Sequence, residues 1–82
     1  MDANQVLAVI KSVAPQLEPT LDPNEPEFMV LLNDGVAIDT HDLEDQEWAI
    51  MDATGLFDRE GIKTEDEMRK VIADYVNHVK NA

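Results

Sequence analysis

The sequence predicts an all-α fold. Apolar residues recur at helical spacing in three separate segments, which is the pattern of a helix with one buried face. The chain has 82 residues, the size of one domain, so we expect a single core built from residues 1–82. Apolar residues make up 44% of the composition, which is enough for that core and argues against disorder.

The first helix is predicted from Asp2 to about Ala14. Aspartate is a favoured N-cap residue, and Pro15 ends the helix because proline lacks an amide proton and clashes with the preceding turn. The apolar face of this helix contains Val6, Val9, Ile10 and Val13.

The middle of the chain fits two different structures. Residues 25–32 (EPEFMVLL) form a short helix if Pro26 lies in its first turn. Alternatively, residues 29–32 and 36–38 are strands of a β-hairpin whose turn is Asn33-Asp34-Gly35. The local pattern slightly favours the hairpin. The alternative fold is therefore α+β, with one helix, a β-hairpin at 29–38 and two further helices.

Two more helices are expected in the second half of the chain. One runs from about Asp42 to Phe57, with Leu43 and Ile50 on the same line as Phe57, and it stops before Gly61. The other runs from about residue 65 to the C-terminus, after a Thr-x-x-Glu capping box at residues 64–67. The apolar stripe of this last helix contains Met68, Val71, Ile72, Tyr75 and Val79.

Residues 47–72 resemble an EF-hand. An apolar helix ends at Phe57, an Asp-x-Glu-Gly turn follows at 58–61, and a single Ile62 precedes a closing Glu67 and the next helix. EF-hands occur in pairs, and a fainter match lies upstream, where the phrase PEFM at 26–29 is similar to the leaving helices of calmodulin and of myosin light chains.

This resemblance implies one four-helix lobe with two helix-loop-helix units, at residues 2–34 and 42–82, joined by a linker at 35–41. Residues 25–32 are then helical. The EF-hand superfamily is the family that the chain resembles, as a single lobe of the calmodulin and myosin light chain type with degenerate loops.

Neither loop of this lobe is expected to bind calcium. The segment from Asp58 to Glu67 has ten residues rather than twelve, so Asp58, Glu60 and Glu67 supply only part of the six to eight oxygens that calcium needs. We therefore expect no metal and no cofactor. The same residues also fit an ordinary helical hairpin, in which a glycine ends one helix and a threonine caps the next.

The net charge of −12 restricts the possible partners. Eighteen acidic residues against six basic ones repel phosphate backbones and anionic lipids, which argues against nucleic-acid and membrane binding and favours a basic partner. The chain begins without the basic and apolar run of a secretory signal, has no membrane-length apolar stretch and has no cysteine. We expect a cytoplasmic protein.

No arrangement of catalytic residues is recognisable in the sequence. The only serine, Ser12, lies inside the first predicted helix, and the three glycines form no phosphate-binding loop. Acids and a histidine cluster at residues 39–45, but acids at a helix start serve the helix dipole. We therefore expect that the protein is not an enzyme.

The predicted function is that of a calcium-independent light chain or regulatory subunit. By the resemblance, it binds a basic amphipathic helix of the IQ type, as in an unconventional myosin heavy chain, through an apolar groove ringed by acids. The residues expected in this groove or in the core beneath it are Val6, Ile10, Phe28, Leu32, Trp48, Met51, Met68, Ile72 and Tyr75. The alternative is a small acidic inhibitor or nucleic-acid mimic that acts by protein–protein binding.

Overall fold

The structure is a computed structural model that describes residues 1–81, and its architecture is α+β. One α-helix and a short 3-10 helix precede the five strands of an antiparallel sheet, and a second α-helix follows them. The helices are α1 (Ala3–Val13), the 3-10 helix (Pro15–Leu17) and α2 (Glu65–Lys80). The strands are β1 (Thr20–Leu21), β2 (Met29–Leu31), β3 (Ala37–Asp39), β4 (Trp48–Met51) and β5 (Asp58–Ile62).

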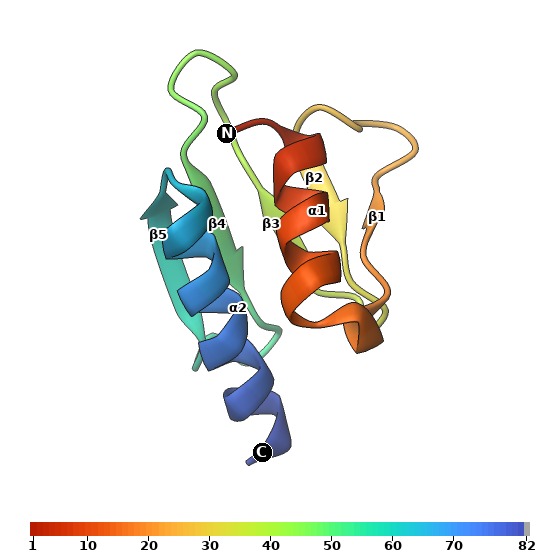
Figure 1. Ribbon diagram of the computed structural model, residues 1–82, viewed down its shortest axis with the longest axis vertical. Helices are drawn as coiled ribbons and strands as arrows, with labels where there is room; N and C mark the ends of the chain where they lie inside the picture. The colour runs from red at the N-terminus through yellow and green to blue at the C-terminus, as the bar shows by residue number, and fades with distance from the viewer. Residues whose placement is uncertain (82) are drawn as a thin grey trace.

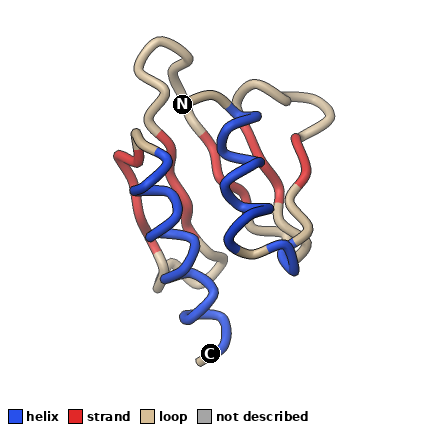
Figure 2. Tube along the Cα trace, viewed as in Figure 1, coloured by secondary structure: helices blue, strands red, loops and turns tan. Residues whose placement is uncertain are grey.

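The sheet is a meander, in which every strand pairs with its neighbours in the sequence. The order β1-β2-β3-β4-β5 needs only short connections because antiparallel neighbours can be joined by tight turns. Figure 1 shows both helices on one side of the sheet, with α1 in front of β2 and β3 and α2 in front of β4 and β5. The tube in Figure 2 shows the same two layers, helices in front of strands.

The core lies between the two layers. Alternate residues of the central strands point toward the helices and are buried, among them Val30, Ile38 and Ile50. The helices bury a matching stripe at helical spacing, which includes Val6, Ile10, Met68, Ile72 and Tyr75. Trp48 is 1% exposed, and its indole N–H donates to the Met1 carbonyl at 2.8 Å. The sheet is therefore covered on one face only.

The predictions for both terminal helices are confirmed. Each helix begins with a capping box. In α1, the Asp2 side chain accepts from the Gln5 amide and the Gln5 side chain accepts from the Asp2 amide. In α2, Thr64 and Glu67 make the same pair of hydrogen bonds. The strands β2 and β3 pair antiparallel, with Val30 opposite Ile38, so the hairpin at 29–38 is also confirmed.

The all-α prediction is wrong, and with it the four-helix EF-hand-like lobe. Residues 42–57 are a loop, β4 and a turn, while residues 25–32 are a turn that leads into β2. A local turn replaces the helix: the Asp52 carboxylate accepts from the Thr54 hydroxyl and the Phe57 amide, and Gly55 adopts φ +76°. The expected loop at 58–67 is β5 followed by the cap of α2.

Within residues 1–81, no helix is long and apolar enough to cross a membrane.

Candidate functional site

The uncovered side of the sheet, which we call the open face, is the candidate functional site. Residues that alternate with the buried ones point away from the helices and stay partly or fully exposed, so this face is formed by Met29, Leu31, Ala37, Asp39, Ala49, Met51, Asp58 and Glu60. Met51 is 59% exposed, although its neighbour Ile50 is 1% exposed. Such a mixed apolar and acidic sheet face is a recognised setting for partner binding.

Three adjoining hollows cross the open face and share Asp39 and His41. Their volumes are about 420, 400 and 210 Å³. Small residues form the floor, since Ala37, Ala49 and Gly61 lie where longer side chains would fill the space. We call these three hollows together the acidic trough.

The acidic trough is lined by carboxylates and by no lysine or arginine. Its acids are Glu25, Asp39, Glu47, Asp58 and Glu60. Glu47 also forms an exposed ion pair with Lys63, at 3.0 Å. The hydrogen bond from Lys63 to Glu47, and then the charge of that carboxylate, raise the pKa of Lys63. The trough is thus suited to positively charged groups.

Two acidic loops extend the trough at one end of the sheet. The β1–β2 loop (22–28) and the β3–β4 loop (40–47) both lie at the end where the N-terminus is marked in Figure 1. Asp22 and Asp42 fold these loops, because each carboxylate accepts an amide two residues ahead at 2.7 and 2.8 Å. The remaining acids of these two loops have no hydrogen-bond or ion-pair partner within residues 1–81, except Glu47: they are Glu25, Glu27, Glu44 and Asp45.

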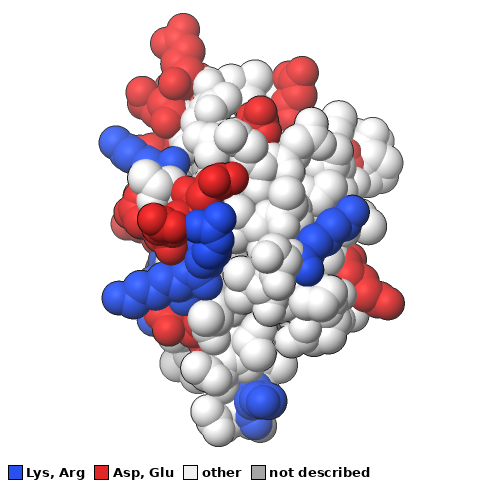
Figure 3. All heavy atoms as spheres, in the orientation of Figure 1, with Lys and Arg blue, Asp and Glu red and all other residues white. Residues whose placement is uncertain are grey.

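The negative charge of the protein is concentrated in the segment that forms the sheet and its loops. Residues 15–64 contain thirteen of the eighteen acids and two of the six bases, so they alone carry −11 of the −12 net charge. The helix α2 carries four acids and three bases, and α1 carries one lysine. Figure 3, which looks onto the helices, shows a broad uncharged area with acidic and basic side chains mixed around it.

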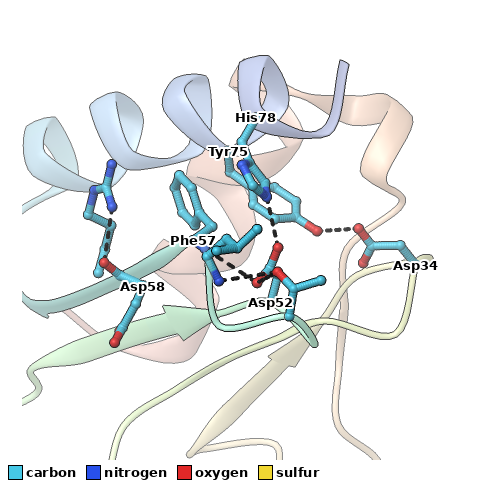
Figure 4. A network of polar contacts seen from close by, with 9 residues as sticks. Asp34, Asp52, Phe57, Asp58, Tyr75 and His78 are labelled. Carbon is cyan, nitrogen blue, oxygen red and sulfur yellow. Dashed lines mark hydrogen bonds and ion pairs between the residues drawn. The ribbon is translucent and has the colours of Figure 1, made fainter. Parts of the chain in front are cut away.

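A second polar cluster ties the β4–β5 turn to α2. His78 contacts the Asp52 carboxylate at 2.8 Å, and the Tyr75 hydroxyl donates to Asp34 (Figure 4). Partial burial opposes ionisation of Asp52, but hydrogen bonds from Thr54, His78 and the Phe57 amide outweigh it and lower the pKa of Asp52 to about 2. Burial, and then the bond to Asp34, raise the pKa of Tyr75.

This cluster is arranged for structure rather than for nucleophilic catalysis. A catalytic hydroxyl has to be hydrogen-bonded to the histidine, whereas the Thr54 hydroxyl donates to Asp52 at 2.8 Å. The His78 ring packs beside Phe57, with centroids 5.3 Å apart, and Phe57 meets Tyr75 edge-on at 5.2 Å. The cluster therefore fastens the sheet to the helix layer.

The residues predicted for a binding groove separate into two groups. Seven are buried in the core, although Trp48 also borders one hollow of the acidic trough: Val6, Ile10, Leu32, Trp48, Met68, Ile72 and Tyr75. The other two meet the acidic trough, because Phe28 is half-buried at one end of it and Met51 is exposed on the open face. Within residues 1–81, no group of three or more His, Cys, Asp or Glu side chains is arranged to hold a metal ion.

The acids of the expected calcium loop also separate. Asp58 and Glu60 lie on β5 and line the trough, whereas Glu67 accepts hydrogen bonds from Thr64 as part of the α2 capping box. Sequence reasoning missed Ala49 and assigned Asp39 to the start of a helix. The signal was the two-residue alternation in Ala37-Ile38-Asp39 and Trp48-Ala49-Ile50, which marks one residue in two as facing away from the core.

No protein-family model, curated protein or solved structure matches this chain.

Proposed function

We propose that this protein is an acidic binding module that docks a positively charged surface of another protein on its open face. The observation that carries the proposal is the acidic trough, in which five carboxylates surround a small-residue floor and no lysine or arginine is present. Lysine and arginine side chains of the partner meet these carboxylates, while its apolar side chains cover Met29, Leu31 and Met51.

The mode of action follows from this charge. A protein that occupies a basic surface competes with nucleic acids and other polyanions for it, so the module acts as an inhibitor or mimic of such a ligand. A basic amphipathic segment, as a light chain would bind, remains a partner of suitable chemistry. Its docking site is then the open face and not a groove between helices.

The test uses a fluorescent twelve-residue peptide with six lysines and six leucines in mixed order. We expect the peptide to bind at low salt and to weaken as salt is added, because the contacts are exposed ion pairs. The double variant Asp39→Asn/Glu60→Gln removes two charges from the trough. Its affinity should fall by roughly three- to tenfold, as expected for two charges at about 0.3–0.7 kcal/mol each, which is within the range of exposed ion pairs.

The matched control is Glu65→Gln/Asp66→Asn, which removes the same charge from the first turn of α2, where Arg69 contacts both acids. Its affinity for the peptide should stay within twofold of the unmodified protein. Equal losses in the two double variants would mean that only the overall charge matters, and the open face would then not be the site.

A further inference from the structure

The outer edge of β5 is the longest unpaired strand edge of the sheet. β5 has five residues, four of them exposed, whereas β1 at the opposite edge has two. The Asp52 amide donates to the Phe57 carbonyl at 3.0 Å, and the alternation of an antiparallel ladder then directs the backbone groups of Arg59 toward β4. Those of Asp58 and Glu60 point outward, where a further strand can bind them.

The two sides of this edge differ in chemistry. On the open face, Asp58 and Glu60 place carboxylates beside the edge. On the helix side, a hollow of about 350 Å³ lies between β5 and α2, where Ile62 and Val71 form an apolar strip bordered by charged side chains of both signs: Arg59, Glu60, Glu67, Lys70 and Asp74. The Arg59 guanidinium borders this hollow, lies 4.5 Å from the centre of the Phe57 ring and donates to the Asp58 carbonyl, so this exposed hydrogen bond has to give way when a partner strand pairs with Asp58.

We propose that β5 accepts an extended segment of the partner as a sixth strand, in which lysine or arginine alternates with valine, isoleucine or leucine. This inference rests on the proposed function and adds the conformation and pattern of the partner. Successive side chains of a strand point to opposite faces. The cationic ones therefore reach Asp58 and Glu60, and the apolar ones enter the hollow beside Val71.

A second copy of this chain does not suit the same edge. In a continuous sheet related by a twofold axis, β5 would pair with itself, and Asp58 would face Glu60 while Arg59 would face Arg59. Like charges directly opposite one another destabilise a strand pair. Gly61 adds a kink, with φ +70° at the irregular register between β4 and β5. The like-charge pairs oppose self-pairing and favour a basic partner, whereas the kink limits any added strand to the edge at residues 58–60.

The experiment compares two nine-residue peptides of the same composition, one with lysine and valine alternating and one with them in separate blocks. The alternating peptide should bind at least tenfold more tightly in a fluorescence anisotropy titration. Two N-methylated forms of it then test the backbone. The peptide whose methylated amides face β5 should lose binding, because those amides can no longer donate hydrogen bonds. The peptide whose methylated amides face away from β5 should bind within twofold of the parent.

A protein variant tests the apolar side of the edge. Val71→Gln should weaken the alternating peptide by roughly three- to tenfold because it places a polar group in the hollow. Ala73→Gln, at an exposed position of the same helix, should have no effect. Circular dichroism of both variants checks that they fold alike.

Each outcome has one meaning. If both methylated peptides bind as well as the parent, or if the two orders of residues bind equally, the sixth strand is wrong while the acidic docking face stands. If none of these peptides nor the mixed peptide binds at low salt, both proposals fail. A dimer in sedimentation that the alternating peptide does not dissociate would also overturn the sixth strand, because the edge would be occupied by a second copy.

Discussion

The helix layer and the open face of the sheet differ in almost every physical property. α1 and α2 bury apolar stripes, begin with complete capping boxes and carry almost no net charge between them. The segment 15–64, which contains all five strands and the loops between them, carries −11 and leaves methionine and leucine partly exposed. The contrast indicates a division of labour, in which one face of the sheet supplies stability and the other supplies recognition.

Two adjacent residues of β4 give the largest expected difference in stability between the two faces of the sheet. Ile50 points into the core and Met51 onto the open face. We expect Ile50→Ala to lower the free energy of unfolding by about 2–5 kcal/mol, because it leaves a cavity, and Met51→Ala to change it by less than about 0.5 kcal/mol. Urea denaturation followed by circular dichroism measures both. Similar losses for the two variants would mean that the open face is covered in the folded protein.

The tie between the layers gives a smaller, pH-dependent effect. The pKa of Asp52 is about 2 in the folded protein, below its ordinary value of 3.8. As the pH falls, protons therefore bind the unfolded chain first, so the stabilisation by the Asp52 carboxylate is complete above about pH 4 and is lost toward pH 2. The difference in unfolding free energy between the unmodified protein and Asp52→Asn should shrink over this window. A difference that is constant from pH 6 to pH 2 would contradict the assignment.

Much of the helix layer, and one strand pair, follow from the sequence because their signals are local. A cap residue, its partner three positions later and an apolar stripe sufficed for α1 and α2, whereas the Asn33-Asp34-Gly35 turn indicated the β2–β3 hairpin only as the alternative to a helix at 25–32. These features depend on residues within a few positions of one another.

The second half of the sheet could not be predicted in this way. β4 has only four residues, Trp48–Met51, so its alternation is too short to identify a strand. The spacing of Leu43, Ile50 and Phe57 matches a helix. Two interactions stabilise residues 48–51 as a strand: the pairing of Ile38 with Ile50 and the burial of Trp48 under the N-terminus. Both join residues distant in the sequence. The trough was missed for the same reason, since its floor comes from three different strands.

A variant in the cap of α2 should have the smallest effect, and it tests whether stability and recognition belong to different layers. Thr64 accepts a hydrogen bond from the Glu67 amide at 3.1 Å, and Thr64→Ala should cost about 1 kcal/mol of unfolding free energy. The same variant should leave the affinity for the mixed lysine–leucine peptide unchanged, because the cap lies in the helix layer. A parallel loss of affinity would show that stability and recognition are not separated as we describe.

Amide chemical shifts during titration with the mixed lysine–leucine peptide test the central claim most directly. We expect the largest changes at residues 37–39, 49–51 and 58–60, which form the open face, and no change along α1 at residues 3–13. Shifts confined to α1 and the exposed side of α2 would contradict the account, because the recognition surface would then be the helix layer.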